Sequence, residues 1–145
     1  ITKRLKDLGA DFVLDYTDNK LDQKVLECAP NGVDLAVEVE FGENIGMIPQ
    51  IMRPMGTVFI YGSGKNMNPQ FPFGDYLFKG LKLDIILVYL MPLTIRKKLI
   101  KVIHDAYTNK ALSPSIDSVY DLHDCAKAHE QVMKPGRNGT VLLKI

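Results

Sequence analysis

The sequence predicts a doubly wound α/β fold, in which helices cover both faces of a parallel sheet. Short apolar runs of strand length alternate with stretches in which apolar residues recur every three or four positions. The central runs, at residues 33–39 and 57–61, are largely apolar on both faces, as buried parallel strands must be. We expect right-handed crossovers between such strands.

The first 40 residues show this alternation twice. A helix is expected to end at Gly9, and a strand is expected at Phe12–Leu14. Asp18 is expected to cap a second helix, which ends before Pro30. A turn then leads into the strand at residues 33–39.

The middle of the chain repeats the alternation of helix and strand, with a proline inside the expected helix. A helix is expected from about Glu43 to Arg53, although Pro49 within it removes a helical hydrogen bond. The segment from Gly56 to Tyr61 reads as a nearly pure strand. A loop rich in Gly, Asn and Pro follows at residues 62–74.

The strongest strand signal lies at Leu81–Leu90, after a short helix expected at residues 75–79. Thr94 is expected to cap the next helix, which runs through Tyr107.

From Ser113 the rhythm changes to strand, helix, strand, expected at residues 116–120, 122–133 and 139–145. We therefore separate residues 1–112 from a C-terminal segment at residues 113–145.

Composition excludes several classes of partner and site. The 18 basic and 17 acidic residues nearly balance, so we expect no nonspecific binding to nucleic acid or anionic membranes. Cys28 and Cys125 lie far apart, which argues against a structural zinc site. His104, His123 and His129 lack ligand spacing and are read as surface or packing residues. No apolar run reaches the roughly 20 residues of a membrane span, so we expect a soluble cytoplasmic protein.

A ligand is expected at the carboxyl ends of the strands, which meet at one crevice in an open parallel sheet. Residues 61–64 combine a tyrosine, two glycines and a serine hydroxyl, although an ordinary strand-to-loop turn has the same composition. The sequence contains no complete glycine-rich phosphate fingerprint and no hydrolase or metalloprotease motif. We therefore assign no catalytic residue.

Several phrases together resemble the medium-chain dehydrogenase/reductase family, in the family's order and spacing. They are Lys6–Tyr16 (K-D-L-G-A-D-F-V-L-D-Y), Gly32–Val39, Arg53–Val58, Tyr61–Ser63, Tyr120–Leu122, Ala126–Glu130 and Gly136–Leu142. The resemblance is closest to the quinone oxidoreductase branch, which needs no zinc. The sequence departs from the family at Met55, where glycine is usual, at Thr140, often lysine, and at the acidic Glu40.

The resemblance implies a Rossmann-like fold that lacks its first strand-helix unit. That unit, with its glycine-rich turn, and an N-terminal barrel domain would precede Ile1, so residues 1–112 would be a partial nucleotide-binding domain. Residues 113–145 would return toward the barrel. We expect this chain alone to be inactive.

The implied ligand is NADP, with NAD as the alternative, and the implied substrates are quinones, enones or related electrophilic carbonyl compounds. The implied nicotinamide-side contacts are Val39, Glu40, Phe41, Tyr61, Gly62, Ser63, Val88, Tyr89 and Leu90. The Leu81–Leu90 strand is expected to pair two copies into a homodimer. Other readings are a non-catalytic α/β module that binds a nucleotide or a protein, and a fragment of a zinc-type alcohol dehydrogenase.

Overall fold

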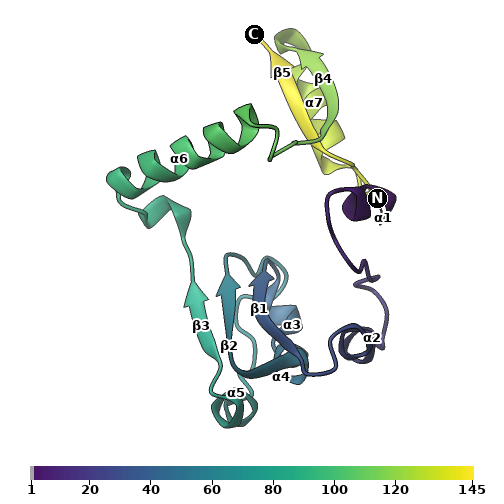
Figure 1. Ribbon diagram of the computed structural model, residues 1–145. Coiled ribbons are helices and arrows are strands. Elements are labelled where there is room, and N and C mark those ends of the chain that lie inside the picture. The colour runs from purple at the N-terminus through teal and green to yellow at the C-terminus, as the bar shows by residue number, and fades with distance from the viewer. Residues whose placement is uncertain (1) are drawn as a thin grey trace. The chain divides into compact units, whose positions relative to one another are not determined.

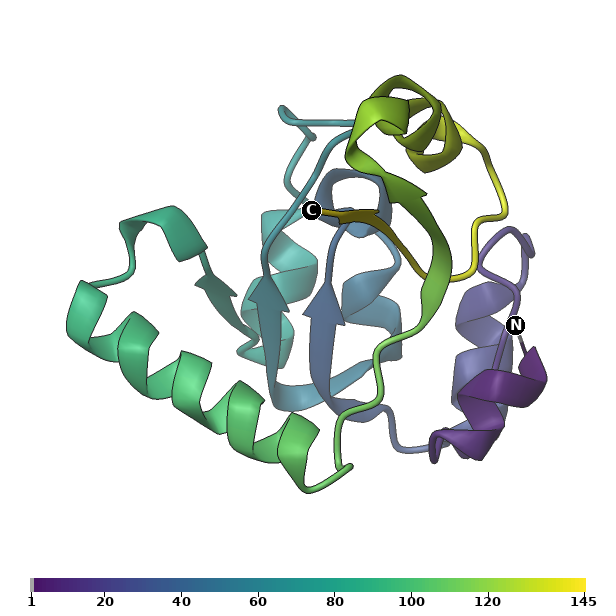
Figure 2. The ribbon, with the colours of Figure 1, turned by 90° about the horizontal axis from the view of Figure 1, so that it is seen from above.

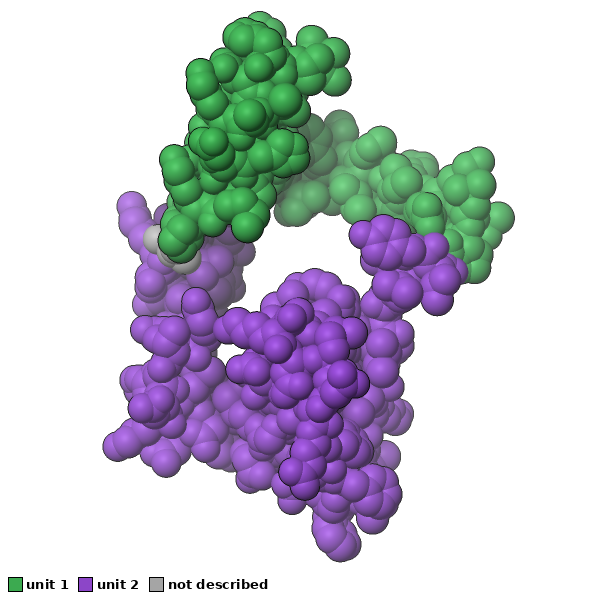
Figure 3. Space-filling model, turned by 180° about the vertical axis from the view of Figure 1, so that it is seen from behind, with its two compact units in different colours: residues 1, 91–145 green, residues 2–90 purple. Residues whose placement is uncertain are grey.

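A computed structural model describes residues 2–145, which form two compact units (Figure 3). We call residues 2–90 the sheet unit and residues 91–145 the C-terminal unit. Both contain parallel strands together with helices, which confirms the predicted α/β class. The predicted division after residue 112 concerns the roles of the two segments in a longer protein, and it stays a prediction.

Three parallel strands form the sheet of the sheet unit, in the order β1-β2-β3, and their arrows point the same way (Figure 1). The strands are β1 (Val33–Glu38), β2 (Met52–Ile60) and β3 (Lys82–Ile85). Helices α1 (Thr2–Asp7) and α2 (Leu21–Cys28) precede β1; α3 (Phe41–Asn44) and α4 (Ile48–Ile51) connect β1 to β2; and α5 (Phe73–Lys79) connects β2 to β3.

The core of the sheet unit is small and lies where β2 meets α4 and α5. Alternate residues of β2 are buried toward these helices because successive side chains of a strand point to opposite faces. The Tyr76 hydroxyl enters this core and donates a 2.9 Å hydrogen bond to the Ile45 carbonyl. Burial raises the pKa of Tyr76 far above its usual value. The buried apolar residues are Ile45, Ile48, Met52, Val58, Ile60 and Tyr76.

Within the sheet unit, the helices that connect the strands pack against one face of the sheet. Helices α3, α4 and α5 lie beside β1 and β2 (Figure 2), whereas Leu35 and Val37 of β1 are 54% and 67% exposed. The strands follow one another in one direction across the sheet, so right-handed crossovers place the connecting helices on one face. Coverage of the second face requires a reversal of strand order.

The strand expected at Phe12–Leu14 is absent from the structure, where these residues have no regular structure. A strand forms only when its backbone groups find a partner. Among the described residues, β1 pairs with β2 and has no strand on its other side. The segment instead lines an apolar cavity of about 530 Å³ with residues of α2 and the start of β1.

The helix expected between Glu43 and Arg53 is also wrong, because two short helices, α3 and α4, replace it. Pro49 lies in the first turn of α4, where a missing N–H costs no helical hydrogen bond. Arg53 and Pro54 belong to β2. They lie in a bulge, because the register jumps from the pair Val33–Met52 to the pair Leu35–Thr57.

Strand β3 is shorter than the predicted run at residues 81–90. It ends at Ile85, and Val88–Leu90 form the short 3₁₀ helix η1. The last bond toward β2 joins the Ile86 N–H to the Ile60 carbonyl. Because β2 itself ends at Ile60, the apolar residues beyond Ile86 have no strand to pair with.

The two predicted side-chain caps are not formed. Lys20 is the N-cap of α2, and the Asp18 carboxylate accepts the Lys20 N–H and pairs with the Lys24 ammonium just before the helix. These two hydrogen bonds lower the pKa of Asp18. Pro92 is the N-cap of the next helix, α6 (Leu93–Thr108), so Thr94 lies inside its first turn.

The C-terminal unit contains the predicted strand-helix-strand segment. Strands β4 (Ile116–Asp121) and β5 (Thr140–Lys144) pair in parallel, and η2 (Leu122–Asp124) and α7 (Cys125–Met133) connect them. Ala128 of α7 is buried against this pair. The Asp117 carboxylate accepts hydrogen bonds from the Gln131 side chain and the Asn138 N–H, which lower its pKa.

Replacing Met55 with glycine is expected to stabilise the protein. Met55 has φ 65°, a left-handed conformation that a side chain with a Cβ adopts only with strain. We expect Met55→Gly to raise the free energy of unfolding by about 0.5–1 kcal/mol, measured by chemical denaturation. Met55→Ala keeps the strain while shortening the side chain, so equal stabilisation by alanine would contradict this explanation.

Removing the buried hydroxyl of Tyr76 is expected to destabilise the sheet unit. Tyr76→Phe leaves the Ile45 carbonyl without its partner, and we expect the free energy of unfolding to fall by about 1–2 kcal/mol. Tyr61→Phe is the matched control, because Tyr61 is 55% exposed. Equal thermal stability of the two variants would show that the Tyr76 bond contributes nothing.

Candidate functional site

The carboxyl ends of the three parallel strands meet at one edge of the sheet (Figure 1). The register pairs Glu38 with Ile60 and Ile60 with Ile85, so Val39 and Tyr61 follow at the same level. We call Val39–Phe41 tip 1, Tyr61–Ser63 tip 2 and Val88–Leu90 tip 3. All nine predicted contact residues therefore lie in the sheet unit, beyond the carboxyl ends of its strands.

Tips 1 and 2 are joined directly by backbone hydrogen bonds. The Tyr61 N–H donates to the Glu38 carbonyl at 3.0 Å, and the Phe41 N–H donates to the Gly62 carbonyl at 3.1 Å. Glu40 and Ser63 form an antiparallel bridge. The two loops thus leave the parallel strands as a short antiparallel pair, which holds both tips in fixed positions.

The Ser63 hydroxyl is occupied by this loop pair. It accepts the Gly42 N–H at 2.7 Å and donates to the Asn66 carbonyl at 2.5 Å. The Asn66 side chain returns a 3.4 Å bond to the Gly42 carbonyl. The serine therefore links the start of α3 to the loop after β2.

Gly42 and Gly62 allow the backbones of the two loops to lie close together. A Cβ on Gly42 would lie 1.9 Å from the Asn66 carbonyl oxygen, and one on Gly62 would lie 2.5 Å from the Val39 carbonyl oxygen. Both positions exclude any larger residue. The sequence reading attributed this open backbone to ligand access; the structure shows that protein atoms use it.

The Glu38 carboxylate fixes the turn between β1 and tip 1. Its Oε1 accepts the Glu40 N–H at 2.6 Å, and both of its oxygens lie 3.1 Å from the Asn44 side-chain nitrogen. Sequence reasoning missed Asn44 and Asn66. The available signal was an asparagine six residues after the end of β1 and again after the end of β2, a residue type that commonly bonds to nearby backbone.

Some polar groups of tips 1 and 2 point to possible ligand contacts. Among residues 2–145, no hydrogen bond reaches the carbonyl oxygens of Val39 or Tyr61. The Val39 and Tyr61 side chains are about half exposed, and tip 3 adds three exposed apolar side chains. The three tips therefore offer apolar surface together with backbone acceptors, which suits a flat ring that carries an amide.

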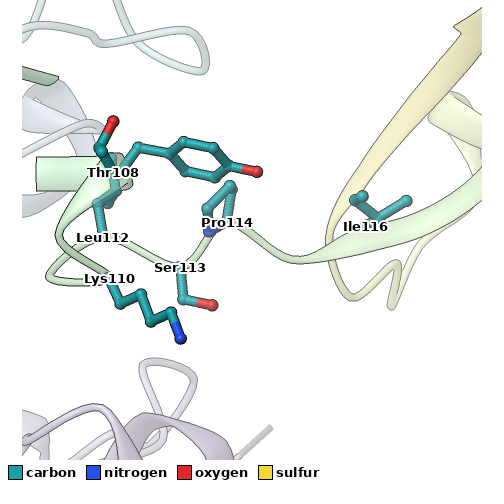
Figure 4. A pocket seen from close by; sticks show the side chains of 7 residues that line it. Thr108, Lys110, Leu112, Ser113, Pro114 and Ile116 are labelled. Atoms are coloured by element: carbon teal, nitrogen blue, oxygen red, sulfur yellow. The ribbon is translucent and has the colours of Figure 1, made fainter. Parts of the chain in front are cut away.

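A separate cavity of about 640 Å³ lies in the C-terminal unit, after the end of α6. Its labelled side chains are spread along the loop that leads to β4, and Ile116 stands apart from the rest (Figure 4). Lys110 and Tyr107 are its only titratable residues. The cavity therefore contains no acid-base or nucleophilic constellation. Its lining is Tyr107, Thr108, Lys110, Leu112, Ser113, Pro114 and Ile116.

Neither a metal cluster nor a membrane helix occurs in the part of the chain that the structure describes. No three His, Cys, Asp or Glu side chains gather there as metal ligands. No helix of residues 2–145 has the length and apolarity to cross a membrane. Whether the longer protein carries zinc stays a prediction.

Comparison with known proteins identifies relatives along nearly the whole chain. The family model described as zinc-binding dehydrogenase matches residues 8–143. The mouse synaptic vesicle membrane protein VAT-1 homolog-like is 22% identical, over 97% of this chain and 37% of its own length. The chain therefore spans less than two fifths of the length of this relative.

Two solved structures share the fold. A mycobacterial protein complexed with NADPH superposes with a TM-score of 0.81 at 21% identity, over 99% of this chain and 45% of its own. A quinone oxidoreductase from Pseudomonas syringae gives 0.81 at 18% identity, over 99% of this chain and 46% of its own.

These likenesses confirm the resemblance to medium-chain dehydrogenase/reductases that the sequence phrases indicated. The matched region includes all three tips and the strand-helix-strand segment at the C-terminus. The chain belongs to the zinc-binding dehydrogenase family.

Proposed function

We propose that this chain is the cofactor-facing part of an NADP-dependent reductase that acts on quinones, enones or related electrophilic carbonyl compounds. One observation carries the proposal: three consecutive parallel strands end at the same edge, where all three tips expose apolar side chains and tips 1 and 2 offer the carbonyl oxygens of Val39 and Tyr61 as acceptors. Ligands of open α/β sheets bind at this position.

The described residues fit the nicotinamide half of such a cofactor. The carbonyl oxygens of Val39 and Tyr61 can accept the N–H groups of the carboxamide, and the Tyr61 ring can lie against the flat ring. When bound, the cofactor supplies a hydride. The role of this chain is to orient the nicotinamide ring and to exclude water from one face of the ring.

The choice of cofactor and substrate is supported by relatives. One structural relative was solved with NADPH, and another is a quinone oxidoreductase. NAD remains the alternative cofactor. The substrate residues and the glycine-rich phosphate turn lie outside this sequence in the proposal, so the chain alone binds dinucleotide weakly and does not turn over substrate. We place the whole enzyme in the cytoplasm and propose that it uses no zinc.

A homodimer through residues 81–90 belongs to the same proposal. All four residues of β3 are exposed, and among the described residues β3 pairs with β2 and has no strand on its other side. A strand with an unpaired edge offers a row of N–H and C=O groups to a second copy. The C₂ symmetry of most dimers makes the same edge available on both partners.

Loss of the Tyr61 ring is expected to weaken NADPH binding. We expect Tyr61→Ala to raise the NADPH dissociation constant by about 2- to 12-fold, since stacked aromatic contacts contribute on the order of 0.5–1.5 kcal/mol. NMR titration of the isotope-labelled chain measures it. Tyr107→Ala is the control, because Tyr107 is similarly exposed but belongs to the C-terminal unit.

Absence of any NADPH binding, or shifts confined to residues away from the three tips, would overturn the proposed function. The remaining reading would then be an α/β module for another nucleotide or for a protein.

A charge on β3 is expected to prevent dimer formation. Ile85 is 77% exposed, and Ile85→Lys would bring two like charges together where the edges pair. We expect the variant to sediment as a monomer at concentrations where the parent chain sediments as a dimer. Met133→Lys, at an 82% exposed position of α7, should leave the dimer intact. A monomeric parent chain would refute the dimer and leave the cofactor proposal untouched.

A further inference from the structure

We propose that Glu40 is a specificity-determining residue that favours the oxidised nicotinamide ring over the reduced ring. This inference rests on the proposed function of the three tips. Glu40 is the only charged residue among the nine residues of the tips. Glu40 is also one of the positions at which this sequence departs from the usual pattern of the family it resembles. A charge at this place can therefore distinguish this chain from relatives that lack it.

The side chain of Glu40 is held in place beside the loop that follows tip 2. Its backbone N–H donates to the Glu38 carboxylate at 2.6 Å, and its Oε1 accepts the Lys65 N–H at 2.7 Å. The antiparallel bridge between Glu40 and Ser63 fixes the backbone of Glu40. The residue is only half exposed. The carboxylate is therefore a preorganised group and does not have to be ordered when a ligand binds.

The second carboxylate oxygen of Glu40 remains available. A Cβ on Gly64 would lie 3.7 Å from Oε2, so this oxygen lies next to a residue without a side chain. Within residues 2–145, no hydrogen bond reaches Oε2, and no Lys, Arg or His forms an ion pair with Glu40. Within the described residues, the negative charge of Glu40 in tip 1 thus has no ion-pair partner.

The redox state of the cofactor changes the charge beside this carboxylate. The nicotinamide ring is neutral when reduced, and departure of a hydride with its two electrons leaves the ring with a charge of +1. A fixed negative charge nearby stabilises the charged form relative to the neutral one. In a reductase, this preference makes donation of the hydride more favourable. For a charge near a protein surface, an effect on the order of three- to tenfold on the ratio of affinities is expected.

The test compares NADP⁺ and NADPH on the 145-residue chain and its Glu40→Gln variant. Both nucleotides share the same phosphates and riboses, so the ratio of their dissociation constants isolates the charge of the ring. We expect Glu40→Gln to weaken NADP⁺ relative to NADPH by three- to tenfold, measured by NMR titration at low salt. The effect should shrink as ionic strength rises, because salt screens a partly exposed charge.

Glu43→Gln is the matched control, with the same loss of charge three residues away on α3, at an exposed position. It should leave the ratio unchanged. Glutamine at position 40 keeps an oxygen that accepts the Lys65 N–H, so an unshifted Gly42 amide resonance, from the N–H that donates to Ser63, shows that the two loops are still joined. An unchanged ratio in Glu40→Gln, with both nucleotides bound, overturns the role of Glu40 alone. Failure of both nucleotides to bind the parent chain overturns the proposed function and this inference together.

Discussion

The hydrogen-bonded join between tips 1 and 2 is the constraint on which the candidate site depends. Parallel strands do not by themselves determine where the chain goes after they end. Here the Phe41–Gly62 and Tyr61–Glu38 backbone bonds continue the pairing of β1 and β2 beyond the sheet. The Ser63 hydroxyl then ties the start of α3 to the following loop. As a result, residues 21 to 23 positions apart in sequence lie side by side.

Two carboxylates near this join have different tasks. Glu38 has both oxygens directed at protein donors, the Glu40 N–H and the Asn44 side chain, so its role is to shape the turn. Glu40 uses one oxygen on Lys65 and leaves the other without a protein partner. The backbone acceptors of Val39 and Tyr61 lie in the same loops. This part of the chain thus combines an ordered backbone with a small number of unsatisfied polar groups, which is typical of binding sites.

Strand order explains why the sheet unit leaves apolar surface exposed. Three adjacent parallel strands in chain order direct right-handed crossovers to one side, so within residues 2–90 Leu35 and Val37 of β1 stay exposed. The outer edges of β1 and β3 also lack strands among the described residues. The two structural relatives described above are more than twice as long as this chain.

The sequence by itself determined the α/β class, the parallel strands around Val58 and the strand-helix-strand segment at the C-terminus. It did so because the period of apolar residues depends on local geometry alone. The family resemblance likewise followed from short sequence segments that occur in the family's order. This resemblance indicated the three strand ends as the place for a ligand. Tertiary structure decided whether Phe12–Leu14 and the residues after Ile86 become strands, because a strand requires a neighbour with free backbone groups. Tertiary structure also decided that Ser63 and Gly62 hold together the loops after β1 and β2. Hydrogen bonds and close contacts between residues far apart in the chain produce no periodic pattern in the sequence, so the sequence could not predict them.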